Sequence, residues 1–209
     1  MKKDFSIIPS KIVCVGRNYS DHAKELGNEV PASPLLFLKA PSAIIQSGDS
    51  IVLPRQSQQV EHEGELAVVI GSDCRNVRDD QDPFAYVLGY TCLNDVTARD
   101  IQREDVQFTR GKSFDTFCPL GPHIETELDV SDLRLTTTVN GVVKQDGLTS
   151  QMVFPVDFLI RYISRQMTLK AGDVIATGTP SGVSPLNAGD RCEVTVEGIG
   201  TLSNLVISG

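Results

Sequence analysis

The sequence predicts an α+β protein built around rolled or sandwiched β-sheets. Strand-like segments dominate the chain and are short, whereas helical periodicity is confined to a few brief stretches. Strands and helices do not alternate regularly, which disfavours a doubly wound parallel sheet and a barrel of eight β-α units. The chain has 209 residues, against roughly 100–200 for a typical domain, so we expect residues 1–209 to form one compact domain.

The strands are predicted from short runs of apolar and β-branched residues between turn-forming residues. Asn140 and Gly141 lie between two such runs and supply the two positive-φ positions of a type I′ turn, which predicts a hairpin. The Pro- and Gly-rich stretches 28–34 and 178–189 are too short to be linkers, so we interpret them as functional loops. The expected strands are 11–15, 35–39, 51–53, 65–70, 87–93, 133–139, 174–177, 192–197 and 201–207.

The clearest helical pattern follows Pro155. Apolar residues recur there at helical spacing, and proline suits the first turn of a helix, so we expect an amphipathic helix over 155–166 that packs on a sheet.

Two shorter helices are expected on local signals. Thr97 and Asp100 resemble a capping box, which predicts a helix over 98–104. Gly27 is a typical residue after a helix end, which predicts a helix over 20–26.

Composition and charge exclude several classes of function. The formal net charge is −8, with acidic and basic residues interspersed, so no broad basic face is expected for nucleic acid or an anionic membrane. No apolar run approaches the 18 residues of a membrane span, and the first residues lack the apolar core of a secretory signal. Five scattered cysteines without a C-x-x-C pair fit free thiols in a reducing cytosol, so we expect a cytoplasmic protein.

An acidic alternation opens the strand-like run that ends at residue 70. A strand would place Glu61, Glu63 and Glu65 on one face. Buried carboxylates repel unless a cation neutralises them, and an all-oxygen site suits Mg²⁺, Mn²⁺ or Ca²⁺. The alternative is a solvent-facing edge strand, although the apolar run 66–70 is not typical of an exposed strand.

A second acid lies where an expected strand gives way to a helix. Asp95 could complete a site of three carboxylates that leaves open positions for water or substrate. Arg99 and Gln102 are three residues apart and would face the same way, and arginine can bind a substrate carboxylate through two hydrogen bonds. The alternative is a surface helix with a solvated arginine.

The segment 16–25 contains a possible general base. His22 and Glu25 are neighbours on one helical face, and a carboxylate beside an imidazole fixes its tautomer and raises its basicity. A surface pair is the alternative. Lys39 ends an apolar strand, Lys112 lies in a polar loop, and the turn at 177–182 could hold an anion on its N–H groups, or simply turn.

Six motifs in order, from about residue 11 to 207, resemble the fumarylacetoacetate hydrolase family, and within it the short acylpyruvase and oxaloacetate decarboxylase branch. They are Gly16-Arg17-Asn18-Tyr19 with His22 and Glu25, Phe37-Leu38-Lys39, Glu63-Gly64-Glu65-Leu66, Asn94-Asp95-Val96-Thr97-Ala98-Arg99-Asp100, Lys112 to Pro122, and Thr177-Gly178-Thr179-Pro180.

The resemblance implies a mixed β-sandwich roll, a homodimer, and Mg²⁺ or Mn²⁺ held by Glu63, Glu65 and Asp95. The position of Glu61 varies among relatives, so it is left out of the metal set. The ion would bind the 2-oxo acid end of a small-molecule substrate. By the same matching, a lid helix carries His22 and Glu25, which act with Lys112 as catalytic residues, and the substrate-binding residues are Arg17, Lys39, Arg99, Gln102 and Thr179.

The first functional hypothesis is hydrolysis of the C–C bond of an acylpyruvate. Metal chelation of the 2-oxo acid would stabilise the pyruvate enolate that leaves, while His22, oriented by Glu25, activates water. The alternatives are decarboxylation of oxaloacetate and isomerisation of 2-oxo diacids in aromatic catabolism, which use the same ion differently. A non-catalytic metabolite-binding module is the remote alternative, and it would not need the His22–Glu25 pair.

Overall fold

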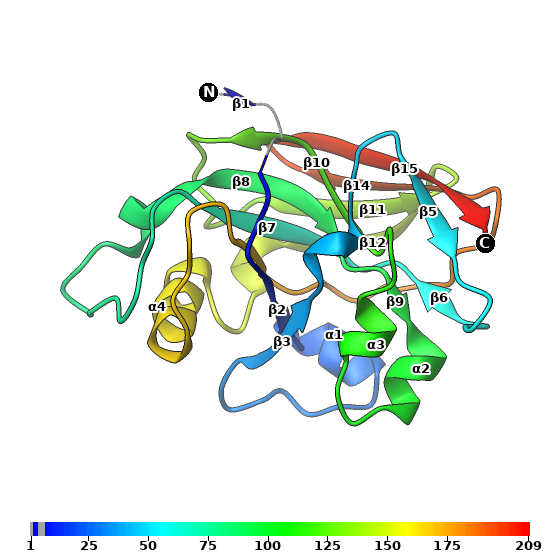
Figure 1. Ribbon diagram of the computed structural model, residues 1–209, viewed down its shortest axis with the longest axis horizontal. Coiled ribbons are helices and arrows are strands. Elements are labelled where there is room, and N and C mark those ends of the chain that lie inside the picture. Colours follow the sequence, from blue (N-terminus) through cyan, green and yellow to red (C-terminus); the bar gives the residue numbers. More distant parts are fainter. Residues whose placement is uncertain (1, 4–6) are drawn as a thin grey trace.

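The larger of the two main β-sheets carries much of the core. In the computed structural model, which describes residues 2–3 and 7–209, this sheet has eight strands (Figure 1). Their order is β1 (Lys2–Lys3), β10 (Cys118–Glu125), β8 (Val87–Asn94), β7 (Gly64–Ile70), β13 (Val174–Ala176), β2 (Ile12–Gly16) and β3 (Leu35–Lys39), with β4 (Ile44–Gln46) paired to β10.

A second sheet of five strands lies against the first. Its order is β12 (Val142–Leu148), β11 (Arg134–Val139), β14 (Arg191–Val196), β15 (Gly200–Ser208) and β5 (Ser50–Leu53). The strands β6 (Val60–Glu61) and β9 (Thr97–Ala98) form a small separate ladder. Parallel and antiparallel neighbours occur in both large sheets, since β13 pairs parallel to β2 and β15 parallel to β5. The expected mixed β fold with few helices is therefore confirmed.

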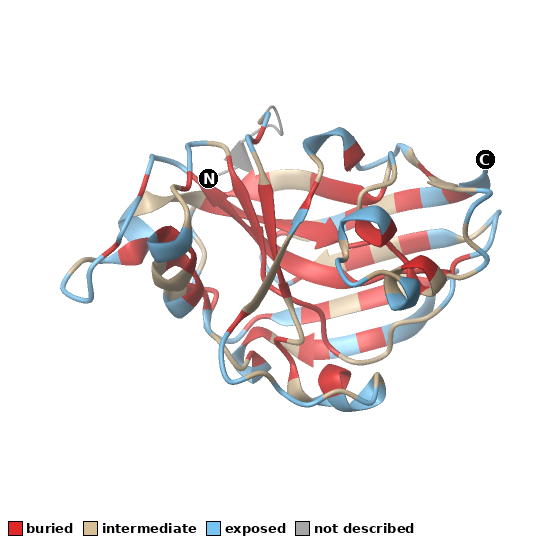
Figure 2. Ribbon diagram, turned by 60° about the horizontal axis from the view of Figure 1, so that its bottom comes forward, coloured by how far each residue is buried: buried red, intermediate tan, exposed pale blue. Residues whose placement is uncertain are grey.

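The two large sheets share one apolar core. Leu66 and Val68 of β7 are fully buried together with Leu135 of β11 and Leu202 of β15. Figure 2 shows buried residues running along the strands and exposed residues on the outer loops and helix faces. The central strand β7 is buried at every position, which agrees with its apolar run over 66–70 and rules out a solvent-facing edge strand.

Helices are few and short. The helices α1 (Ser20–Glu25), α2 (Arg99–Glu104) and α3 (Thr109–Lys112) lie together at one end of the molecule, while α4 (Val156–Gln166) lies apart from them (Figure 1). Single turns of 3₁₀-helix occur at Pro41–Ala43, Pro83–Tyr86 and Thr149–Gln151. Helix α4 buries Leu159, Ile160 and Ile163, as its periodicity predicts.

Most of the predicted elements are confirmed. Asn140 and Gly141 have φ values of 53° and 75°, and the flanking Val139 and Val142 pair directly, as a type I′ hairpin requires. Gly27 follows α1 with a φ of 70°. All five cysteines are free and buried. No helix in the described part of the chain is long and apolar enough to cross a membrane.

Two local predictions are wrong. Thr97 does not cap α2, because its hydroxyl donates to the Asp95 carbonyl and Ala98 is the residue that precedes the helix. The carboxylate of Asp100 instead accepts from the Gln58 and Ile101 amides. The run from Glu61 is not one strand either, since β6 ends at Glu61 and β7 begins at Gly64.

Candidate metal centre and active site

Two adjacent strands bring three carboxylates together. Glu63 and Glu65 flank the first residue of β7, and Asp95 directly follows β8, which pairs antiparallel to β7. The Asp95 amide donates to the Glu63 carbonyl over 2.8 Å, which closes the end of the ladder. One carboxylate oxygen from each residue lies within 4.8 Å of the others, and all three residues are buried. Glu61 lies outside this carboxylate cluster.

Basic side chains surround two of the three carboxylates. The Lys112 ammonium donates to Glu63 Oε2 over 2.8 Å and to Asp95 Oδ2 over 2.7 Å. The Lys39 ammonium donates to Asp95 Oδ1 over 2.5 Å and to the Val96 carbonyl. Both lysines are buried. Lys39 is not among the residues that line the cavity described below. It therefore binds Asp95 on the side of the carboxylate that faces away from the cavity.

The buried guanidinium of Arg99 links the cluster to helix α2. It donates from Nη2 to Glu63 Oε1 over 2.6 Å and from Nε to Glu61 Oε2 over 2.8 Å. It also donates from Nη1 to Gln102 Oε1 over 2.7 Å, so Arg99 and Gln102 do face the same way. Glu61 lies in the separate strand β6 and pairs with Arg99 there, whereas Glu65 belongs to β7.

Of the three carboxylates, Glu65 is the one that makes no ion pair with a basic side chain among the residues that the structure describes. Its Oε2 accepts a hydrogen bond from the Gly178 amide over 2.8 Å. Burial, followed by the charges of Asp95 and Glu63, holds its pKa well above the ordinary range. Burial also acts on Glu63, but there Lys112 and Arg99 prevail and lower the pKa.

A divalent cation fits this arrangement. It would relieve the repulsion that acts on Glu65, and three carboxylates are the hard oxygen ligands that Mg²⁺ and Mn²⁺ prefer. The cluster is thus consistent with a divalent metal site.

Helix α1 presents an imidazole and a carboxylate over the cluster. His22 Nδ1 lies 3.2 Å from Glu25 Oε2, and His22 is buried. Because a carboxylate only accepts, this contact favours the neutral tautomer that carries its proton on Nδ1, and in that tautomer Nε2 is an acceptor. The Gly182 amide donates to the same Glu25 carboxylate over 3.0 Å. N–H groups of the turn at 177–182 therefore bind carboxylates of the protein itself, Glu65 and Glu25.

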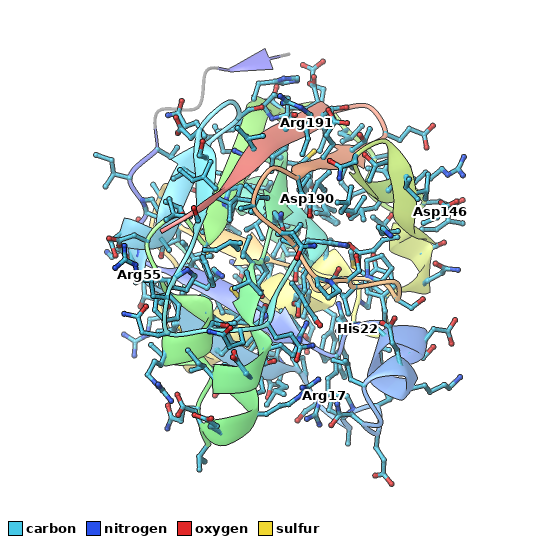
Figure 3. The ribbon with its side chains drawn as sticks, turned by 90° about the vertical axis from the view of Figure 1, so that its right-hand side faces the viewer. Arg17, His22, Arg55, Asp146, Asp190 and Arg191 are labelled. Atoms are coloured by element: carbon cyan, nitrogen blue, oxygen red, sulfur yellow. The ribbon has the colours of Figure 1, made fainter. Side chains whose placement is uncertain are left out.

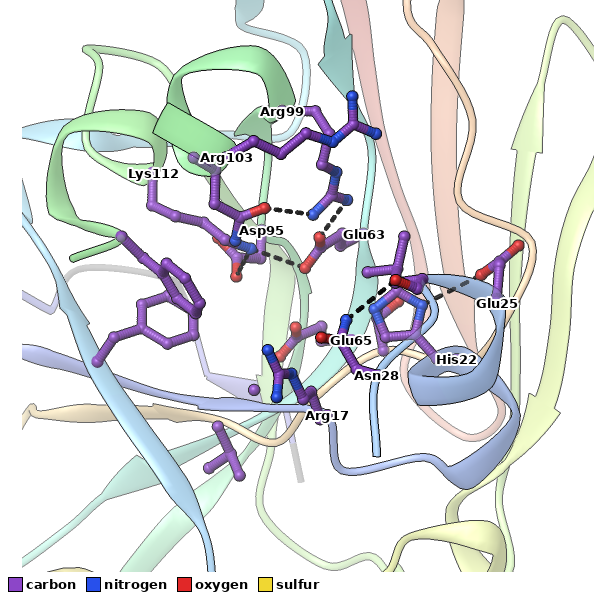
Figure 4. A pocket seen from close by; sticks show the side chains of 17 residues that line it. Arg17, His22, Glu25, Asn28, Glu63, Glu65, Asp95, Arg99, Arg103 and Lys112 are labelled. Atoms are coloured by element: carbon purple, nitrogen blue, oxygen red, sulfur yellow. Dashed lines mark hydrogen bonds and ion pairs between the residues drawn. The ribbon is translucent and has the colours of Figure 1, made fainter. Parts of the chain in front are cut away.

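These groups line one cavity of about 410 Å³ (Figure 4). Arg17 extends into it from a backbone with a φ of 59°, a conformation that is uncommon for residues other than glycine. Figure 3 shows Arg17 and His22 at the same end of the molecule, away from Asp190 and Arg191. The lining residues are Val15, Gly16, Arg17, His22, Glu25, Leu26, Asn28, Phe37, Glu63, Glu65, Asp95, Arg99, Gln102, Arg103, Phe108, Lys112 and Thr179.

Some lining residues were not predicted from the sequence. Arg103 lies four residues after Arg99, so the helical spacing that linked Arg99 to Gln102 could have included it. Phe37 and Phe108 meet edge to face with centroids 5.4 Å apart. Lys112 Nζ lies 5.1 Å from the Phe37 centroid. No sequence signal joins these two rings, because they come from β3 and the loop before α3.

The chain belongs to the fumarylacetoacetate hydrolase family of enzymes. The family pattern described as Fumarylacetoacetate (FAA) hydrolase C-terminal matches residues 11–207, so the resemblance drawn from the motifs is confirmed.

The relatives in this family include proteins named as a tautomerase and as an isomerase. The chain is 55% identical over 201 residues to an uncharacterized protein of Archaeoglobus fulgidus, covering 96% of this chain and 80% of that protein. It is 43% identical over 212 residues to the oxaloacetate tautomerase YisK of Bacillus subtilis, covering 95% of this chain and 70% of the relative. The crystal structure of a 5-carboxymethyl-2-hydroxymuconate delta-isomerase from Mycobacterium smegmatis superposes with a TM-score of 0.91 at 50% identity, covering 97% and 80% of the two chains.

Proposed function

We propose that this chain is a divalent-metal-dependent enzyme that interconverts the keto and enol forms, or isomers, of small 2-oxo diacids. The observation that carries the proposal is the charge balance of the cavity. Its acidic and basic side chains cancel, so a divalent ion would leave two positive charges for the substrate. The names of the tautomerase and isomerase relatives support the same class of reaction.

The balance is between five basic and five acidic residues in or directly behind the cavity. A dianion would complete neutrality, whereas the monoanion of a simple acylpyruvate would leave one buried charge uncompensated, which is costly. The basic residues are Arg17, Lys39, Arg99, Arg103 and Lys112, and the acidic residues are Glu25, Glu61, Glu63, Glu65 and Asp95.

Two of the five basic residues form no ion pair with an acidic residue of the described chain. Among the described residues, neither Arg17 nor Arg103 forms an ion pair, and Arg103 donates only to the neutral amide oxygen of Gln59 over 3.1 Å. We assign these two guanidinium groups to the second carboxylate of the diacid. Arg99, Gln102 and the backbone amide of Thr179 would hold the first carboxylate and the 2-oxo group, because the Thr179 hydroxyl hydrogen is already bonded to the Gly64 carbonyl.

The metal would be Mg²⁺ or Mn²⁺, held by Glu63, Glu65 and Asp95. When bound, it would chelate the 2-oxo acid and make the C3 hydrogens more acidic.

The residues of this chain then supply the proton transfers. His22 Nε2 takes a proton from C3, and the electron pair of the C–H bond becomes the C2–C3 double bond. Lys112 has a third N–H beyond those given to Glu63 and Asp95, and it stabilises the negative charge that develops on the 2-oxygen. The imidazolium of His22 returns the proton to that oxygen. Glu25 stabilises the imidazolium in the meantime.

Hydrolysis of an acylpyruvate is the second candidate function. The His22–Glu25 pair favours it, because the same oriented imidazole can deprotonate a water molecule for attack on the distal carbonyl. We also propose that residues 1–209 act as one catalytic domain, because the residues that line the cavity come from segments between Val15 and Thr179 and the family pattern matches residues 11–207. We further propose that the chain forms a homodimer, as the family resemblance implies.

A substrate panel tests the proposal. Oxaloacetate, unsaturated 2-oxo diacids and monoanionic acylpyruvates are assayed with Mg²⁺, with Mn²⁺ and after chelation. Keto–enol conversion of the diacids should be accelerated and should disappear on chelation. Cleavage of acylpyruvates at a higher kcat/KM would favour the second candidate, and no turnover with either metal would contradict both.

Replacing Arg103 tests whether the cavity selects a substrate with two carboxylates. Arg103→Met should raise KM for oxaloacetate by about tenfold and leave KM for a monoanionic 2-oxo acid within about twofold, since only the diacid carries a second carboxylate. Equal changes for the two substrates would contradict the assigned role of Arg103.

A further inference from the structure

A buried glutamine of the second sheet contacts the backbone between two of the carboxylates. Gln145 lies in β12 and is completely buried. Its Oε1 accepts from the Gly64 amide over 2.9 Å and faces His62 Nδ1 at 3.1 Å. Its Nε2 donates to Thr179 Oγ1 over 2.7 Å and to the Pro180 carbonyl over 2.8 Å. A side-chain amide has two donor hydrogens and two acceptor lone pairs, so all of its hydrogen-bonding capacity is used.

Three of these groups form a closed ring of hydrogen bonds. Gly64 donates to Gln145, Gln145 donates to Thr179, and the Thr179 hydroxyl donates back to the Gly64 carbonyl over 2.8 Å. The Gly64 N–H belongs to the peptide unit that follows Glu63, and its carbonyl belongs to the unit that precedes Glu65. Each ring bond to Gly64 therefore fixes the peptide plane next to one carboxylate of the cluster.

The same glutamine also affects the carboxylate group of Glu65, through the turn that hydrogen-bonds to it. The Gly178 amide that donates to Glu65 Oε2 is next to Thr179, and Gln145 holds both Thr179 and Pro180. The backbone at Gly64 has no space for a side chain, because a Cβ there would lie 2.1 Å from Thr137 Oγ1 and 3.2 Å from a Val194 methyl group. Gly64 must therefore pass directly against the second sheet.

We propose that Gln145 is a positioning residue for the metal site, acting through Gly64 and the 178–180 turn on the directions of Glu63 and Glu65. The proposal rests on the proposed function in one respect, namely that these carboxylates bind a divalent ion. Gln145 itself lies outside the cavity lining. Groups that orient metal ligands in this way are commonly responsible for about 10- to 100-fold in metal affinity.

The test measures Mn²⁺ binding to the full chain by isothermal titration, together with thermal denaturation in EDTA. Gln145→Met keeps the length of the side chain but removes all four hydrogen bonds. The matched control is Asn204→Leu, which removes another buried amide of the second sheet, one that donates to the Gln46 and Asp49 carbonyls. Both variants should unfold at lower temperature, whereas only Gln145→Met should bind Mn²⁺ about 10- to 100-fold more weakly.

A second pair of variants breaks the ring at another member, in case Gln145→Met does not fold. Thr179→Val should weaken Mn²⁺ binding by a similar factor, and Thr179→Ser, which keeps the hydroxyl, should restore it. Mn²⁺ affinity within twofold of the wild type in Gln145→Met or Thr179→Val would overturn the positioning role of Gln145 and leave the metal site itself standing. Absence of Mn²⁺ binding by the wild-type chain would instead overturn the metal site and this proposal with it.

Discussion

Replacing Lys112 by methionine tests the electrostatics of the cluster in depth. The ammonium lies between Glu63 and Asp95, and the three side chains are exposed by 2%, 7% and 1%. Lys112→Met preserves the volume of the side chain but removes the positive charge between Glu63 and Asp95. The repulsion among these two carboxylates and Glu65 is then less compensated. Removing one partner of a buried ion pair costs about 3–5 kcal/mol, and each kcal/mol corresponds to about 2–4 °C in Tm for a chain of this size.

The metal-free variant should therefore unfold about 6–20 °C below the wild type. The loss should be partly reversible by metal, because a divalent ion supplies the missing charge. At 100 times its Kd, an ion that binds only the folded state adds about 2.7 kcal/mol, or about 5–11 °C. Mn²⁺ should also bind the variant more tightly than the wild type, because the ammonium no longer competes for Glu63 and Asp95.

Differential scanning calorimetry with EDTA or with Mn²⁺ measures both effects. The control is Lys24→Met, since Lys24 and Asp21 form an exposed pair with 73% and 74% exposure, and such pairs contribute little. Its Tm should change by no more than about 2 °C. A Tm of the metal-free Lys112→Met variant within that same range would refute the argument that this ion pair is buried and energetically coupled to the cluster.

Three further predictions concern the base, the lid and the acid stability. His22→Ala should lower hydrolysis of any acylpyruvate substrate by about 10²- to 10⁴-fold and decarboxylation of oxaloacetate much less; equal losses in steady-state assays would mean that the His22–Glu25 pair only closes the lid. Hydrogen exchange across 18–34 should slow when oxalate binds, because the short helix there has little to pack against without ligand; unchanged exchange would count against a lid. Asp173 has its pKa lowered, against its burial, by Lys11 and the neighbouring amides. Its contribution is therefore present above the unfolded pKa and lost as pH falls through the folded pKa, so Asp173→Asn should lower Tm at pH 7 and have little effect near pH 2; an equal loss at both would contradict this.

The strands that the sequence predicted have either an apolar run, as in 66–70, or apolar residues that alternate with polar ones, as in 192–197. β7 is buried on both faces, as its apolar run over 66–70 favoured over an exposed edge strand. The sequence did not predict β10, because Cys118–Glu125 contains Pro119, Gly121 and Pro122, which normally argue against a strand. The structure accommodates them where the register with β8 shifts after Gly121. Helix α3 spans only Thr109–Lys112, too short to show a period.

The carboxylate cluster was predictable because each of its members lies within a few residues of the end of an expected strand. Glu63 and Glu65 are two residues apart, and Asp95 directly follows the neighbouring strand. The contacts of Gln145 with Gly64 and of Glu25 with Gly182 were not predictable in the same way. They join residues 81 and 157 positions apart, and they depend on how the two sheets and the turn at 177–182 pack.

The most direct test of the central claim is a Mn²⁺ titration of Glu65→Gln beside the wild-type chain. Glu61→Gln is the matched control, because Glu61 pairs with Arg99 and lies outside the carboxylate cluster. We predict one ion per chain for the wild type and for Glu61→Gln, and no stoichiometric binding, with loss of activity, for Glu65→Gln. One tightly bound Mn²⁺ per chain in Glu65→Gln would contradict the assignment of Glu63, Glu65 and Asp95 as a shared metal site.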